Sequence, residues 1–134
     1  MSSLSAFLNP VSIQETRDIV ISKRFVGEDG KPVHFRIRSL TQEENEVLRK
    51  RSRKTRRVNG QNQEYLDSAE FSARMIVAAT VEPDFSSKEL CDAYGVLDPL
   101  MVPGKMLLAG EYAALMSAIT DLCGFSDTEE ELKN

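Results

Sequence analysis

Apolar residues recur with helical spacing in the C-terminal part of the chain. Within EYAALMSAITDLCGF, residues 111–125, they occupy one face of an α-helix. The residues with this spacing are Tyr112, Leu115, Met116, Ile119, Leu122 and Cys123. Glu111 suits the positive end of the helix dipole, and Gly124 stands where a left-handed residue ends a helix. The pattern predicts a core helix, with Phe125 folding back on Ile119.

Before Leu40 the apolar residues alternate with polar ones, which is typical of half-buried strands. The alternation predicts strands over residues 19–26 and 33–37. A register that pairs Phe25 with Val33 and Ile21 with Ile37 brings both apolar sets to one face. This register needs a three-residue loop, Glu28-Asp29-Gly30, with Gly30 in the left-handed conformation.

The first sixteen residues are expected to form an irregular arm. Leu4, Phe7 and Leu8 are apolar, and Pro10 disfavours helix at Asn9. The apolar residues could dock on the body of the same chain or on a neighbouring molecule, and the same chain is the favoured interpretation.

After Leu40 the spacing is helical. Thr41 with Glu44, and Ser86 with Glu89, have the spacing of capping boxes at helix starts. Pro83 is expected to end a central helix at residue 81 or 82. The sequence therefore predicts an α+β fold, with an N-terminal β-hairpin and a mostly α-helical body of about four to five helices. The expected single domain, 1–134, comprises the arm 1–16, the hairpin 17–40, the helical body 41–125 and an acidic, disordered tail 126–134.

A dense basic run lies between Leu48 and Val58. It consists of Arg49, Lys50, Arg51, Arg53, Lys54, Arg56 and Arg57. Because no apolar side chain interrupts it, we expect a frayed helix end that projects into solvent, followed by a mobile loop over residues 58–63. Like charges four residues apart repel on a helix, so the run is locally unfavourable unless a partner compensates.

Two functional interpretations of this run stay open beside a plain solvated helix end. The seven cations could bind an acidic protein surface, including the acidic half of a second copy. They could also contact nucleic acid, but no aromatic side chain lies within the run and the whole chain is acidic. We therefore prefer a protein partner.

Composition and charge narrow the class of protein. The 134 residues carry a net charge of −4, with 41% hydrophobic residues. Residues 1–60 hold 13 Lys or Arg and 7 Asp or Glu, a net +6, whereas residues 61–134 hold 4 and 14, a net −10. The longest apolar run is too short to cross a bilayer and the N-terminus does not resemble a signal peptide. Two cysteines, Cys91 and Cys123, suggest free thiols in a reducing compartment, so we expect a cytoplasmic protein.

Candidate chemistry is sparse. His34 is the single histidine and falls on the solvent side of its expected strand. The sequence has no nucleophile elbow, no phosphate-binding loop and no Cys/His metal spacing. We therefore predict a protein that is not an enzyme, with no catalytic residues, metal or cofactor.

Several motifs, taken together and in order, resemble the phage tail assembly chaperone family of the XkdN type. They are LSAFLNPV at residues 4–11, SKRFVGEDGKPVHFRIRSLTQEEN at 22–45, VEPDF at 81–85, AYGV at 93–96 and KMLLAGEYAAL at 105–115. One departure is Ala109, where the family motif MLLPGEY leads us to expect proline.

The resemblance implies a non-enzymatic assembly factor of contractile-tail phages and PBSX-like prophages, acting in the host bacterial cytoplasm. Such proteins are expected to bind the tape measure protein, to keep it soluble while tail tube subunits polymerise, and to be absent from the finished tail. A frameshifted longer form is known in many such systems. The alternative function is a small nucleic-acid-associated phage regulator that uses residues 49–57.

Overall fold

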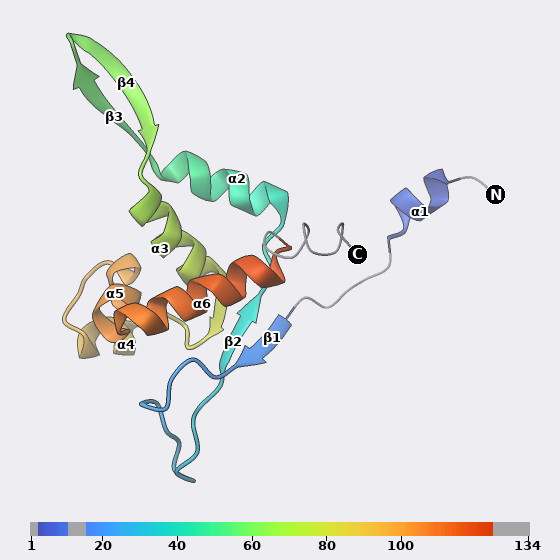
Figure 1. Cartoon of the computed structure of the whole chain (residues 1–134), viewed down its shortest axis with the longest axis vertical. Helices are drawn as coiled ribbons and strands as arrows, with labels where there is room; N and C mark the ends of the chain where they lie inside the picture. Colours follow the sequence, from blue (N-terminus) through green and yellow to red (C-terminus); the bar gives the residue numbers. More distant parts are fainter. Residues whose placement is uncertain (1–2, 11–15, 125–134) are drawn as a thin grey trace.

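The computed structural model describes residues 3–10 and 16–124, which form helices and two small antiparallel sheets (Figure 1). The predicted α+β class is confirmed at this level. In chain order the elements are α1 (Leu4–Leu8), β1 (Thr16–Ile19), β2 (Phe35–Arg38), α2 (Gln42–Arg51), β3 (Arg53–Val58), β4 (Gln61–Leu66), α3 (Ser68–Ala79), β5 (Thr80–Glu82), α4 (Lys88–Ala93), the 3-10 helix η1 (Pro99–Met101), α5 (Val102–Met106) and α6 (Ala109–Leu122). Phe125 and the predicted tail 126–134 lie outside the described residues.

Helix α6 carries the predicted buried stripe. Leu115 and Ile119 are fully buried, and the other members of the stripe are half-buried. Gly124 has φ +87°, the left-handed conformation expected of a residue that ends a helix. The helix begins at Ala109, and residues 109 and 110 form part of its first turn.

The core lies where α3, α6 and β2 meet. Phe35 and Ile37 of β2 point into it, while Arg36 between them is exposed. Met75 and Ile76 of α3 are buried there, and α3 contacts α2, α5, η1 and α6, so it is the central helix. The apolar positions of three elements thus converge on one cluster.

The main sheet has three strands in the order β1-β2-β5. Strand β5 was not predicted. Helix α3 ends at Ala79, before the expected residues 81 and 82, because Thr80 and Val81 turn into an extended segment. This segment pairs with β2. Thr80 and Val81 are both β-branched, which suits a strand better than the end of a helix. The pairing with β2 is what makes them a strand and not a further part of α3.

The N-terminal hairpin agrees with the predicted register only near its tip. The Val33 N–H donates to the Phe25 carbonyl at 2.7 Å, and Gly30 has φ +77° as required. Further from the tip, Ile37 pairs with Arg17, whereas the prediction paired it with Ile21. The prediction was wrong there because residues 20–24 leave the strand and form a loop.

The N-terminal segment also differs from its prediction. It contains a short helix, α1, and this helix ends before Pro10. Leu4, Phe7 and Leu8 are 59%, 80% and 68% exposed, so the favoured docking of these residues on the body of the same chain is not observed. The irregular arm was a wrong prediction for residues 4–8.

Side-chain caps fix several helix starts. The Thr41 hydroxyl accepts the Glu44 N–H at 3.1 Å, and the Glu44 carboxylate accepts the Thr41 N–H at 3.0 Å, so this capping box is confirmed. Helix α4 is capped by Ser87, which accepts the Leu90 N–H at 3.3 Å. The predicted cap, Ser86, is one residue too early.

Replacement of Ile119 by alanine tests the central role of α6. The side chain is fully buried, so Ile119→Ala is expected to lower the free energy of unfolding by about 2–5 kcal/mol. Denaturant melts measure the loss, with exposed Ser117→Ala on the same helix as the control. A loss below about 0.5 kcal/mol would show that Ile119 is not a core residue.

A proline at position 109, which the resemblance to the motif MLLPGEY led us to expect, should stabilise the chain at the start of α6. Ala109 is the first residue of α6, where the N–H has no partner within a helix. Leu108 has φ −71° and ψ 159°, a conformation that suits a residue before proline. We expect Ala109→Pro to raise the free energy of unfolding by about 0.4–1 kcal/mol, mainly by restricting the unfolded chain. A lower melting temperature for Ala109→Pro would contradict this reading of the helix start.

Candidate functional site

The basic run lies mostly on a two-stranded ribbon, which corrects the prediction of a frayed helix end. Helix α2 ends at Arg51, and β3 and β4 follow as an antiparallel pair that projects away from the helices (Figure 1). Asn59 and Gly60 join the strands with φ 52° and φ 78°. Positive φ at both central residues defines the tight hairpin turn for which Asn-Gly is preferred. Residues 58–63, predicted as a mobile loop, are therefore the last residue of β3, this turn and the start of β4.

The ribbon is anchored at its base. Ser52 is fully buried, and its hydroxyl donates to the Leu48 carbonyl at 2.8 Å. Across the base, the Asp67 N–H donates to the Ser52 carbonyl at 2.8 Å, and the Asp67 carboxylate caps α3 by accepting the Glu70 N–H at 3.0 Å. Both strands are thus tied to helices, although residues 53–65 are exposed.

The strand register divides the ribbon into two faces. Val58 lies opposite Gln61, and the pairing continues to Arg53 opposite Leu66. Because side chains alternate along a strand, opposite residues share a face. We call one face the aromatic face; it consists of Lys54, Arg56, Val58, Gln61, Gln63 and Tyr65. The opposite face consists of Arg53, Thr55, Arg57, Asn62, Glu64 and Leu66.

All seven cations named in the sequence analysis are exposed, but they do not form one cluster of free charges. Lys54 forms an ion pair with Glu70 at 3.1 Å. The Arg56 guanidinium lies 4.8 Å from the centre of the Tyr65 ring, and Arg49 lies 5.7 Å from the ring of Phe71. Sequence reasoning missed the aromatic partners because they come from β4 and α3, outside the run. The Asn-Gly turn was the signal that could have revealed the first of them.

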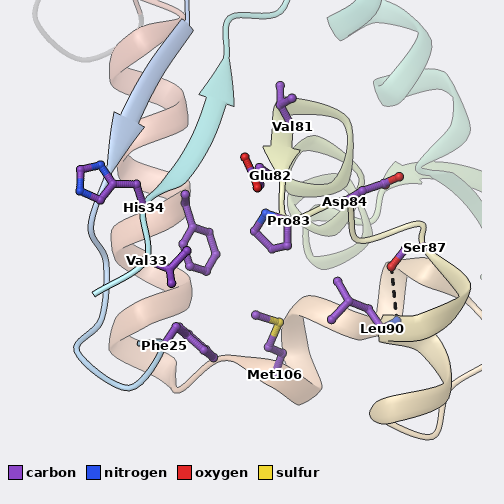
Figure 2. Close-up of a pocket in the computed structure, with 11 residues that line it drawn as sticks. Phe25, Val33, His34, Val81, Glu82, Pro83, Asp84, Ser87, Leu90 and Met106 are labelled. Atoms are coloured by element: carbon purple, nitrogen blue, oxygen red, sulfur yellow. Dashed lines mark hydrogen bonds between the residues drawn. The ribbon is translucent and has the colours of Figure 1, made fainter. Parts of the chain in front are cut away.

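A second candidate surface is an apolar hollow of about 600 Å³ between the N-terminal hairpin and the segment around α4 (Figure 2). Its lining includes Phe25, Val33, Val81, Pro83, Leu90 and Met106. Figure 2 shows Phe25 and Val33 on the hairpin side, facing Leu90 and Met106. Val33 and Val81 are 43% and 46% exposed, so apolar surface in the hollow is open to a partner.

Carboxylates accompany the apolar lining. Glu82 and Asp84 line the hollow and are exposed, and His34 also belongs to its lining. Residues 82–98 contain five acidic residues and one basic residue, Lys88, which binds Asp92 at 2.8 Å. Glu82 and Asp84 thus place negative charge in the hollow, and Arg36 of β2 lies directly opposite Glu82 in the sheet. The hairpin that forms one wall of the hollow lies at the other end of the molecule from the ribbon (Figure 1).

An ion pair holds the hairpin side of the hollow in place. Arg24 and Glu111 form a two-point contact, with Arg24 Nε 2.9 Å from Glu111 Oε2, and Arg24 Nη2 also donates to the Met106 carbonyl at 3.0 Å. Next to this ion pair, the centres of the Phe25 and Phe35 rings are 5.7 Å apart. The hydrogen bond from Arg24, with further bonds from Ser22 and the Leu108 N–H, lowers the pKa of Glu111 to about 2.

The lowered pKa predicts a pH-dependent effect of Glu111→Gln. A carboxyl with a lower pKa in the folded state stabilises the fold above its unfolded pKa, and this contribution disappears as the pH falls towards the folded value. We expect the variant to be less stable than the wild type at pH 7, with the difference shrinking as the pH falls from about 4.5 towards 2. Urea melts across this range measure it, with exposed Glu28→Gln as the control. A difference that does not change with pH would show that the charge of Glu111 is not responsible.

The described residues offer little for a metal or membrane role. No group of three or more His, Cys, Asp or Glu side chains among them could hold a metal ion. No helix in the same part of the chain is long and apolar enough to span a bilayer. Cys91 and Cys123 are free, as predicted; Cys91 is buried and Cys123 half-buried.

A projecting charged ribbon and an open apolar hollow are typical of proteins that bind other macromolecules. The chain belongs to the phage XkdN-like tail assembly chaperone family, whose model matches residues 4–134. It is 37% identical to YqbN of Bacillus subtilis (strain 168) over 133 residues, covering 97% of this chain and 89% of YqbN. It is 36% identical over 138 residues to the phage-like element PBSX protein XkdN of the same strain, covering 98% and 93%.

A solved structure supports the same relationship. The crystal structure of YqbN matches with a TM-score of 0.77 and 34% identity, over 94% of this chain and 99% of that one. The family resemblance inferred from the sequence motifs is therefore confirmed, and with it a role in phage tail assembly.

Proposed function

We propose that this chain binds the tape measure protein of its phage or prophage, keeps it soluble while the tail tube assembles, and does not remain in the finished tail. Membership of the tail assembly chaperone family carries the proposal. The chain would act without catalysis, in the host bacterial cytoplasm, and the tail tube protein is a second possible partner. The exposed ribbon supports a binding role, because its cations are held on an anchored scaffold that reaches beyond the body.

Within this proposal, Arg49, Lys50, Arg51, Arg53, Lys54, Arg56 and Arg57 contact an acidic protein surface. All seven are exposed, and residues 49–58 contain no carboxylate. Charges concentrated on a projecting element increase the rate at which an oppositely charged partner is captured, and salt screens them. The alternative, a nucleic-acid contact, gains one observation from the structure: Arg56 and Tyr65 together resemble a stacking platform for a base.

Co-expression with the tape measure protein tests the proposal. We expect the chain to raise the soluble yield of its partner and to be captured with it. The variant Arg53→Gln/Lys54→Gln/Arg56→Gln/Arg57→Gln should fold and reduce the capture, most strongly at low salt. Val33→Ser/Val81→Ser, which alters the apolar hollow, is the comparison variant and shows whether that surface takes part.

An unchanged soluble yield, with both proteins folded and abundant, would count against the proposal. Mobility-shift assays with DNA and RNA at several salt concentrations address the alternative. Loss of nucleic-acid binding in the four-residue variant, without any effect on the tape measure protein, would support the regulator instead.

A further inference from the structure

The two exposed surfaces described above are complementary to each other. The aromatic face of the ribbon combines cations with exposed apolar groups: Lys54 and Arg56 with Val58 and Tyr65, which are 40% and 37% exposed. The hollow combines carboxylates, Glu82 and Asp84, with an apolar lining. Each surface alone leaves apolar groups in water beside charged groups, of which Lys54 pairs with Glu70 and Glu82 lies opposite Arg36 in the sheet.

We propose that the aromatic face of the ribbon docks into the hollow of a second copy of this chain. Lys54 and Arg56 would lie against Glu82 and Asp84, while Val58 and Tyr65 would cover the apolar lining. The proposal stands apart from tape measure binding, because it concerns copies of this chain alone.

The shapes of the two surfaces fit this arrangement. Two paired strands lie about 4.8 Å apart, so the ribbon is a narrow projection that can enter a concave surface. The hollow is open and has a volume of about 600 Å³, enough for more than one side chain. The ribbon points away from the hollow of its own molecule (Figure 1), so a second molecule must supply the partner surface.

The existing contacts of these residues do not prevent docking. Lys54 pairs with Glu70 on the exposed surface, and such pairs contribute little stability, so Lys54 can exchange partners at small cost. Arg56 is already held against Tyr65, which reduces the side-chain freedom lost on binding. On the hollow side, Asp84 accepts the Ser86 N–H at 2.9 Å, and this bond fixes the position of the carboxylate.

The contact joins two different surfaces, so it is heterologous. Each copy still exposes one free ribbon and one free hollow after the first contact, and association would continue into chains or close into a ring. The contact area is small and charged, so self-association should be weak, dependent on concentration and reduced by salt.

The opposite face of the ribbon provides a matched control. Arg53 and Arg57 lie on that face with Glu64, and its other ribbon residues are polar except for Leu66 at the base. Arg53→Glu/Arg57→Glu changes the net charge of the ribbon by the same amount as Lys54→Glu/Arg56→Glu. Docking by the aromatic face predicts that only the second variant loses self-association.

Sedimentation velocity of the purified full chain, over a series of concentrations and salt, measures the association. We expect Lys54→Glu/Arg56→Glu and Glu82→Lys/Asp84→Lys each to weaken it by about tenfold or more, as expected for loss of paired charges. An equimolar mixture of these two variants should associate again, because the reversed charges are complementary. Val81→Ser, which removes apolar surface without disturbing a hydrogen bond, should weaken association even if the Glu82/Asp84 variant does not fold.

Three results would overturn the proposal. The first is a chain that stays monomeric at every concentration in low salt. The second is an equal effect of the Arg53/Arg57 and Lys54/Arg56 variants, which would show a response to net charge alone. The third is a monomeric chain whose Lys54/Arg56 variant loses binding to labelled DNA or RNA, which would assign the aromatic face to nucleic acid. The solubility of the tape measure protein in co-expression is measured separately. A chain that does not self-associate therefore leaves the proposed function open.

Discussion

The ion pair between Arg24 and Glu111 ties the N-terminal hairpin to the first turn of α6. It joins residues that are 87 positions apart, and the same guanidinium donates to the Met106 carbonyl just before α6. To reach α6, residues 20–24 leave the strand, so the hairpin has one register at its tip and another at its base. The displaced loop carries Phe25 to the side of the hollow that faces Met106. The loop that Arg24 anchors to α6 therefore also forms part of a candidate binding surface.

Local signals in the sequence account for much of the fold. The Thr41 capping box, the left-handed Gly30 and Gly124, and the buried stripe of α6 each depend on residues a few positions apart, and each was predictable. Strand β5 and the loop at residues 20–24 could not be predicted in this way. Thr80 and Val81 pair with β2, and Arg24 lies in a loop where it contacts Glu111 of α6. Both segments contact residues that are distant in the sequence, and no local pattern in the sequence identifies those residues.

The ribbon shows a different reason for a wrong prediction. Its signal was local and strong, since Asn-Gly favours a two-residue hairpin turn. The absence of apolar residues between Leu48 and Val58 led instead to the prediction of a frayed helix end. The ribbon has no buried face: it is held by the buried Ser52 and the Asp67 cap at its base. The division of the candidate residues into two faces could be seen only once the strand register was known.

This division changes the physical meaning of the basic run. On a helix, seven cations in nine residues would be distributed around the axis and would repel one another across each turn. In the structure three of them stay on α2, and the four on β3 are divided equally between two faces, each of which also receives the side chains of the opposite strand. One face thereby combines two cations with Val58 and Tyr65, and the other combines two cations with Glu64. A partner can distinguish these faces although their positive charges are equal in number. The difference between the two faces therefore comes from β4, which supplies almost none of the ribbon's charge, and the turn that joins the strands brings this difference about.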